Sequence, residues 1–168
     1  MFGLHDTVCR RNKINGLPGT LGLMNQYISK LNFETMGLGL TDITNEIKQA
    51  VKLSNIETGI VNLSIMHTSA SLIIQENASN DVQRDLLAFL DNLVPMGDKK
   101  IYEHRFEGKD DMPAHIKTML TNTNLTLSII KSKLQLGVWQ GIFLFEHREQ
   151  YHERQVTVHC IGKDNKRD

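Results

Sequence analysis

The chain has 168 residues, the length of one ordinary domain. Its 19 basic and 19 acidic residues cancel to a formal net charge of zero, and this balance argues against a nucleic-acid or membrane-surface partner, which would need an excess of basic charge. No apolar run approaches the roughly 18 residues that cross a bilayer, and no apolar stretch near the N-terminus suggests a secretory signal. The two cysteines lack CxxC spacing and suggest no disulfide framework. We therefore expect a cytoplasmic protein.

Residues 1–23 differ from the rest of the chain. Glycine and proline punctuate them, and no helical or strand period persists. Met24 stands directly before the first clear strand. We therefore expect a loose N-terminal leader at 1–23, a single domain at 24–162 and a polar tail at 163–168.

The first half of the domain alternates strands and helices. Polar and apolar residues alternate over 26–34 and 59–67, which predicts two strands, and 71–75 reads as a further strand. Apolar residues at helical spacing predict two helices, over 41–53 and 80–93. We expect both apolar stripes to be buried. They consist of Ile43, Ile47, Ala50 and Val51 in the first helix, and Val82, Leu86, Phe89, Leu90 and Leu93 in the second.

The second half begins with a polar, irregular stretch over 97–112. Long ordered loops carry function more often than other segments do. A short helix is expected from Pro113 to Leu120, since proline suits the first turn of a helix. Three strands close the chain, near 125–130, 134–146 and 154–161. Strands that follow strands favour antiparallel pairing, so the expected fold is α+β, a mostly antiparallel sheet with two main helices and a short third helix.

Two histidines stand at the ends of predicted strands. His67 continues an apolar strand face and is followed by small residues, among which the hydroxyls of Ser69 and Ser71 suit an anionic ligand. His147 continues the face of Phe145 in the same way. A lone histidine at a strand end is usually structural, so the structural and the functional interpretations both stay open. No P-loop, GxGxxG, HExxH or GxSxG motif decides between them.

The strongest local pattern surrounds the start of the short helix. His115 is expected near the positive end of this helix, whose field disfavours the imidazolium and leaves the ring able to bind a metal or an oxyanion. The same helix end offers backbone N–H groups to a phosphate, and Lys117 would add positive charge. Asp110 and Asp111 precede the histidine, and capping of the helix is an equally good interpretation of both.

Three neutral imidazoles with an open fourth position form an arrangement typical of catalytic zinc. We expect one divalent ion, zinc or magnesium, held by His67, His115 and His147. Glu76 and Asp111 are candidates to orient these ligands or to transfer protons. The competing hypothesis is that the three rings bind a phosphate directly. His104 reads as an ordinary surface residue.

The same segments resemble the signature segments of the YjbQ family, in the expected order and over about Met24 to Gly162. The resemblance rests on His67-Thr68-Ser69-Ala70-Ser71, Glu76-Asn77, Asp81, Asp111-Met112-Pro113-Ala114-His115-Ile116-Lys117, Trp139-Gln140-Gly141 and Glu146-His147-Arg148. It implies an α+β fold, a cytoplasmic homotrimer and a histidine-lined pocket able to bind metal.

The resemblance also implies a reaction, the thiamine-phosphate synthase activity described for the family as a secondary one. This reaction joins a pyrimidine diphosphate to a thiazole phosphate with loss of pyrophosphate, so the expected partner is a small phosphorylated substrate. Candidates to bind it are Ser69, Ser71, Asn77, Lys117 and Arg148. Two alternatives stay open: a metal-dependent hydrolase of a small phosphorylated or amide substrate, and a non-catalytic ligand-binding trimer.

Overall fold

The computed structural model describes residues 24–97, 101–104 and 106–164. The expected leader at 1–23 lies outside the described residues, as does 165–168. Two residues of the expected tail, Lys163 and Asp164, belong to the last strand. The elements follow in the order β1 (Asn25–Thr35), β2 (Gly39–Asp42), α1 (Thr44–Leu53), β3 (Ile56–Ile65), β4 (Ala70–Glu76), α2 (Asn80–Leu93), α3 (Asp111–Leu120), β5 (Asn124–Ile130), β6 (Lys133–Leu134), β7 (Gln140–Glu146) and β8 (His152–Asp164).

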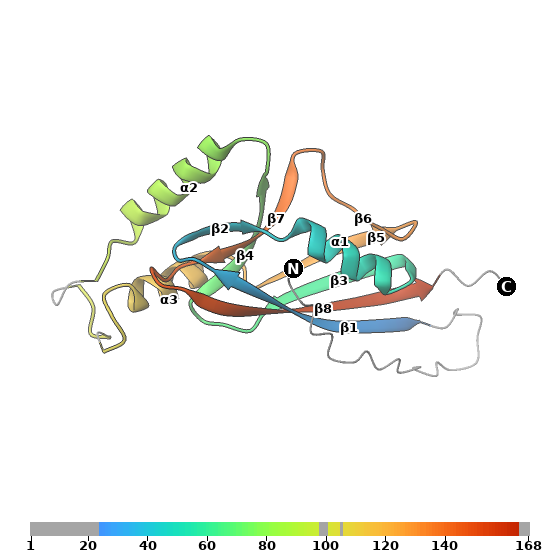
Figure 1. The fold of residues 1–168 in the computed structure, drawn as a ribbon, viewed down its shortest axis with the longest axis horizontal. Helices are drawn as coiled ribbons and strands as arrows, with labels where there is room; N and C mark the ends of the chain where they lie inside the picture. Colours follow the sequence, from blue (N-terminus) through green and yellow to red (C-terminus); the bar gives the residue numbers. More distant parts are fainter. Residues whose placement is uncertain (1–23, 98–100, 105, 165–168) are drawn as a thin grey trace.

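The strands form two antiparallel sheets. The five-stranded sheet has the order β1-β8-β3-β5-β6, and the three-stranded sheet has the order β2-β7-β4. The first and last strands, β1 and β8, pair with each other from Asn25 opposite Gly162 to Thr35 opposite His152. These pairings confirm the expected α+β fold with mostly antiparallel strands (Figure 1).

The structure corrects the expected single strand over 134–146. β6 ends at Leu134 in the larger sheet, and β7 begins at Gln140 in the smaller one, so the chain crosses between sheets at 135–139. The short strand β2 was not predicted: residues 35–40 were assigned to no element, and the helix was expected to begin at residue 41, whereas β2 extends to Asp42. Gly37 and Gly39 have positive φ angles, and the extended backbone resumes directly at Gly39.

The hydrophobic core lies between the two sheets and α1. Ile47 and Val51 of α1 are 0% and 1% exposed, and they belong to one buried cluster with residues of β3, β4, β7 and β8. The helix is fixed to the smaller sheet because the Ile43 N–H donates to the Ile142 carbonyl at 2.9 Å. β7 is the central strand of that sheet and is buried on both faces, in keeping with its apolar run from Ile142 to Phe145.

The second long helix differs from α1. No residue of α2 is buried, and Phe89 and Leu93 are 64% and 56% exposed. Figure 1 shows α2 standing apart from the strands, and the remaining residues of its apolar stripe, Val82, Leu86 and Leu90, are only half-buried. The expectation that this stripe is buried is therefore wrong for the described part of a single chain.

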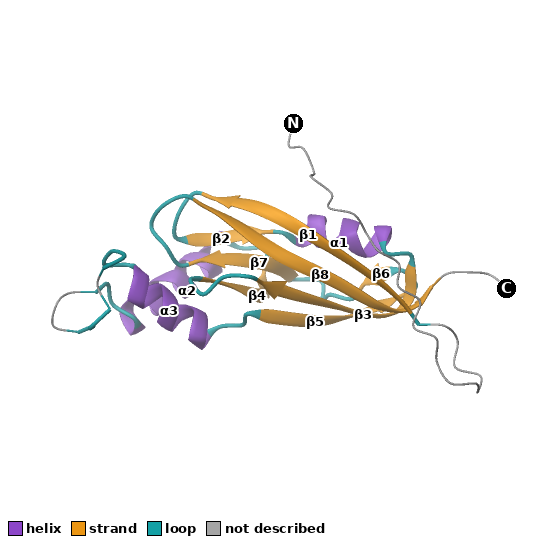
Figure 2. Cartoon of the chain, turned by 90° about the horizontal axis from the view of Figure 1, so that it is seen from below, coloured by secondary structure: helices purple, strands orange, loops and turns teal. Residues whose placement is uncertain are grey.

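Two helices gather at one end of the strands. Figure 2 shows α2 and α3 there, with α1 toward the other end. An ion pair links the two, since the Lys117 ammonium of α3 lies 2.5 Å from the Asp91 carboxylate of α2. None of the described helices is long and apolar enough to cross a bilayer.

Candidate metal centre

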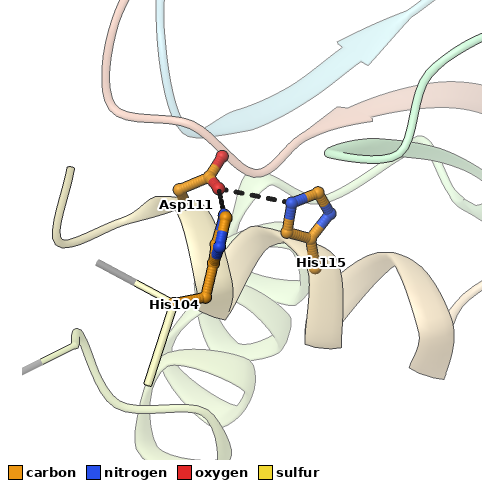
Figure 3. Close-up of side chains that lie close together, drawn as sticks. All are labelled: His104, Asp111 and His115. Atoms are coloured by element: carbon orange, nitrogen blue, oxygen red, sulfur yellow. Dashed lines mark hydrogen bonds and ion pairs between the residues drawn. The ribbon is translucent and has the colours of Figure 1, made fainter. Parts of the chain in front are cut away.

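Three side chains at the start of α3 form a compact group of metal-ligand atoms. Nitrogen atoms of His104 and His115 and a carboxylate oxygen of Asp111 lie within 4.8 Å of one another. Asp111 and His115 stand four residues apart, which places them on one helix face, and His104 reaches them from the preceding loop (Figure 3). Of the described residues, no other set of three histidines, cysteines or acidic residues meets this distance.

One carboxylate oxygen faces both rings. Asp111 Oδ2 lies 2.8 Å from His104 Nε2 and 3.3 Å from His115 Nε2. The other nitrogen of His115, Nδ1, lies 3.0 Å from the Thr68 carbonyl. Since a carbonyl oxygen only accepts, Nδ1 carries a proton and donates it. The Nε2 that faces Asp111 either donates to the carboxylate, if the ring is protonated, or offers its lone pair to a cation held between the two atoms, if the ring is neutral.

The group is buried on the carboxylate side and open on the histidine side. The Asp111 side chain is 3% exposed, while those of His104 and His115 are 43% and 34% exposed. Two imidazoles and one carboxylate are three protein ligands, and the solvent-facing side leaves room for a fourth position. This is the pattern of a catalytic rather than a structural zinc site.

Arg148 supports the acidic residues from the end of β7. Its Nε donates to Asp110 Oδ2 at 2.9 Å, and its Nη1 bonds Asp111 Oδ1. The expected capping role of Asp110 is not observed: this residue stands at the N-cap of α3, but its carboxylate bonds Arg148 and the Glu149 N–H instead. Burial alone would raise the pKa of Asp110, but these donors outweigh it and lower that pKa.

The predicted ligand His67 has a structural role. Its Nε2 accepts from the Gln155 N–H at 2.9 Å, one step beyond the last paired residues of β3 and β8. Burial, and then the charge of Arg154, lower the pKa of His67, which keeps that nitrogen free to accept. The ring therefore extends the strand pairing through Nε2, which leaves only Nδ1 as a possible metal ligand.

The predicted ligand His147 is enclosed in the protein. Its side chain is 1% exposed, its Nε2 lies 2.9 Å from the Ser71 hydroxyl, and its ring packs 4.3 Å from that of Phe145. Burial, and then the charge of Lys117, lower its pKa to about 3. The structure thus does not assemble His67, His115 and His147 around one ion. Only His115 of that predicted set takes part in the observed group.

A buried ion pair lies behind this region. Arg154 donates to Glu146 from Nη2 at 2.6 Å and from Nε at 2.7 Å, and it reaches the Ser69 hydroxyl at 3.1 Å. Sequence reasoning missed this pair, although Arg154 alternates with Val156 and Val158 and so falls on their buried face. Burial would raise the pKa of Glu146, but Arg154 and its other donors lower it.

The other predicted site residues are engaged inside the chain or lie far from the centre. Ser69 and Ser71 bond Arg154 and His147, and Lys117 is 1% exposed beside Asp91. Glu76 and Asn77 stand at or beyond the opposite end of β4 from Ala70, about 20 Å along the strand. Of the predicted substrate-binding residues, only Arg148 lies beside the metal-ligand group.

The sequence identified His115 as a candidate ligand but interpreted His104 as an ordinary surface residue. The sequence placed His104 in a polar loop that it marked as functional, but nothing in the sequence fixed the loop against α3. Asp111 was expected to orient the histidine ligands or to transfer protons. It does lie beside two imidazoles, but its own carboxylate is one of the three possible ligands.

The fold and the donor set define a two-sheet α+β protein with a candidate centre of two histidines and one carboxylate. The chain belongs to the family described as UPF0047 protein YjbQ-like, whose model matches residues 29–163. A UPF0047 protein from Synechocystis sp. is 46% identical over 138 residues, which are 82% of this chain and 93% of that protein. The UPF0047 protein YjbQ from Escherichia coli O157:H7 is 38% identical over 82% of this chain and 99% of its own length.

Solved structures agree with this assignment. A YbjQ-like protein of unknown function from Sulfolobus solfataricus superposes with a TM-score of 0.77 at 25% identity, over 83% of this chain and 99% of that one. A yjbq/upf0047 family protein from Clostridium acetobutylicum gives a TM-score of 0.71 at 37% identity, over 78% of this chain and 98% of that one. These descriptions name a family and not a reaction.

Proposed function

We propose that this protein is an enzyme that acts on a small phosphorylated substrate with a divalent ion held by His104, Asp111 and His115. One observation carries the proposal: two imidazole nitrogens face the same buried carboxylate oxygen at 2.8 and 3.3 Å. The Thr68 carbonyl fixes the tautomer of His115 so that its lone pair points into the group. A cation there satisfies all three ligand atoms at once.

The donor set narrows the choice of ion. Imidazole suits zinc and other first-row transition ions, whereas magnesium prefers oxygen ligands and keeps several waters. Two nitrogens and one carboxylate oxygen therefore favour zinc or a similar ion over magnesium. The local charge favours a divalent cation of either kind, because two carboxylates, Asp110 and Asp111, face the single guanidinium of Arg148.

The reaction we propose first is of the thiamine-phosphate synthase type, which the family resemblance implies. Joining a pyrimidine diphosphate to a thiazole phosphate releases pyrophosphate, so negative charge grows on the leaving phosphates. A divalent ion supplies Lewis-acid stabilisation of such charge. The chain's own contribution is to hold Asp111 rigid in a buried position and to leave the two imidazoles open to a substrate.

A second candidate is a metal-dependent hydrolase of a small phosphorylated or amide substrate. It is favoured by the three protein ligands and the solvent-facing side of the group, which is the arrangement of zinc hydrolases. The two reactions need the same residues and differ only in whether water or a second substrate attacks.

We also propose a cytoplasmic homotrimer. The support for the assembly is the uncovered apolar stripe of α2, in which Phe89 and Leu93 are largely exposed. Exposed apolar patches on soluble proteins mark interaction sites, and a second copy of the chain would remove these side chains from water.

The experiment is an activity assay on metal-free protein before and after loading with zinc. Turnover of the two thiamine precursors supports the synthase reaction, and zinc-dependent release of phosphate or amine from single substrates supports the hydrolase. In either case His115→Ala should abolish the activity. The matched control is His159→Ala, which removes a histidine of β8 that is bonded to Gln26 of β1 and should leave the activity intact. Full activity without any metal, or in His115→Ala, would refute the proposal.

A further inference from the structure

We infer that Arg148 is a positioning residue that makes Asp111 a one-oxygen ligand and thereby selects zinc over calcium at this centre. The inference rests on the proposed function, since it concerns the ion held by His104, Asp111 and His115. It adds a residue that touches neither the ion nor a substrate and acts through Asp111.

The carboxylate of Asp111 is divided between two kinds of partner. Its Oδ1 accepts from Arg148 Nη1, while its Oδ2 faces both imidazoles. A guanidinium bonded to one oxygen fixes the rotation of the carboxylate and occupies that oxygen. Only Oδ2 is then turned toward the position of the ion.

The contacts of Arg148 need an arginine and not merely a positive charge. Three of its nitrogens reach three different acceptors: Nε bonds Asp110, Nη1 bonds Asp111, and Nη2 bonds the Glu107 carbonyl at 2.7 Å. A planar guanidinium presents these donors in a fixed fork, whereas the single ammonium of lysine cannot reproduce them. The guanidinium thus ties the start of α3 and the loop before it to the end of β7.

Arg148 is itself held from the protein interior. Its backbone N–H and that of His147 both donate to Glu146 Oε1 at 3.0 Å. Glu146 is 0% exposed and is paired with Arg154 in turn. The turn that carries Arg148 is therefore fixed by a buried charge pair and is not free to follow Asp111 if that carboxylate rotates.

One-oxygen ligation has a consequence for the choice of ion. Zinc accepts four ligands, and two imidazoles, one carboxylate oxygen and one open position complete its shell. Calcium takes six to eight oxygen ligands, and binding a carboxylate through both of its oxygens is one way to reach that number. By occupying Oδ1, Arg148 withholds the second oxygen that calcium would use.

Charge alone predicts the opposite effect of this residue. Arg148 carries a positive charge close to the position of a cation, so its removal should tighten metal binding if repulsion were its only effect. A positioning role predicts weaker zinc binding after the same removal. The sign of the change in affinity therefore separates the two roles.

The test compares zinc and calcium affinities of metal-free wild-type protein with those of Arg148→Met and Lys109→Met. Lys109 is the matched control, because it also stands near Asp111 but pairs with Glu149 at 3.2 Å on the surface. Arg148→Met should weaken zinc binding about 10- to 100-fold and lower the ratio of zinc to calcium affinity. Lys109→Met should leave zinc affinity unchanged or slightly raised.

Arg148→Lys is a second variant that keeps the charge, and it should weaken zinc binding as well. Circular dichroism shows which variants are folded. If Arg148→Met is unfolded, the zinc affinity of Arg148→Lys decides whether Arg148 has a positioning role. Zinc affinity at or above the wild-type value in the folded Arg148 variants would overturn this inference and leave the proposed function standing. A wild-type protein that binds no zinc would overturn both.

Discussion

The helices α1 and α2 carry apolar stripes of the same helical spacing, yet only one of them is covered. α1 follows β2 closely and packs against strands of both sheets, where Ile47 and Val51 are buried. α2 follows the edge strand β4 and leads away from both sheets, so that none of its residues is buried. Helical periodicity shows which face of a helix is apolar, whereas the connections before and after the helix decide what covers that face.

The same contrast separates the two ends of the molecule. α1 contributes the apolar side chains of Ile47, Ala50 and Val51 to the hydrophobic core. Around α2 and α3 the buried groups include the Lys117 ammonium, the His147 ring and the Asp111 carboxylate. Burying charge is costly unless it is paired. We therefore assign most of the folding stability to the α1 end and the chemistry to the α3 end.

The largest expected effect is at the α1 end. Ile47→Ala removes a side chain that is 0% exposed and leaves a cavity between α1 and the sheets. The free energy of unfolding should fall by about 2–5 kcal/mol, measured by urea titration. Zinc affinity of the folded variant should not change. A loss below 1 kcal/mol would show that α1 is no better packed than α2.

Lowering the pH should reduce the free energy of unfolding by a somewhat smaller amount, through a group at the α3 end. The pKa of His147 is lowered from 6.5 to about 3 in the folded protein, first by burial and then by Lys117. Between pH 6.5 and about 3, His147 is therefore protonated in the unfolded chain but neutral in the folded protein. This contribution to stability is complete above pH 6.5 and is lost as the pH falls toward 3, which costs roughly 2 kcal/mol between pH 7 and pH 5.

The variant His147→Gln isolates this contribution, because it removes the titrating group. Its free energy of unfolding should depend less on pH between 7 and 5 than that of the wild type. The lowered pKa values of Glu146 and Asp110 also stabilise the folded state at neutral pH, but this contribution is lost only below about pH 5, where both carboxylates ordinarily titrate, so it changes little between pH 7 and pH 5. An unchanged slope would mean that His147 is protonated inside the folded protein.

The smallest change in the stability of the single chain is expected in α2. The double variant Phe89→Ser and Leu93→Ser should alter its free energy of unfolding by about 1 kcal/mol or less, since both side chains are exposed. Its effect should appear in the assembly instead. Sedimentation should show a trimer for the wild type and a monomer for the variant.

The control for this experiment is Met36→Ser, which changes a side chain that is 89% exposed outside α2. It should sediment as the wild type does. A monomeric wild-type protein at micromolar concentration would refute the trimer and leave the bare face of α2 for another partner.

The sequence predicts the fold where local periodicity carries the information. Val61 and Leu63 alternate in β3, and Val156 and Val158 alternate in β8, and all four are buried as expected. Cys160 continues the second series as a small buried residue, and burial raises its pKa to about 11. The crossing between the two sheets at 135–139 could not be predicted, because it depends on pairing between distant strands.

The candidate site was predicted in part for the same reason. His115 and Asp111 stand four residues apart on one helix, so their proximity follows from local geometry. His104 joins them through a contact with Asp111 that is made from the preceding loop. His67 instead accepts a hydrogen bond from a backbone N–H of β8. Contacts between segments far apart in sequence decide which histidines meet, and a single sequence does not reveal them.

Zinc titration of metal-free protein by calorimetry distinguishes the two possible sets of ligands, because two histidine variants then give opposite outcomes. If His104, Asp111 and His115 hold the ion, one zinc should bind per chain to the wild type and to His67→Ala, and His104→Ala should lose most of the affinity. Loss of zinc binding in His67→Ala with full binding in His104→Ala would contradict the account and restore the set of His67, His115 and His147.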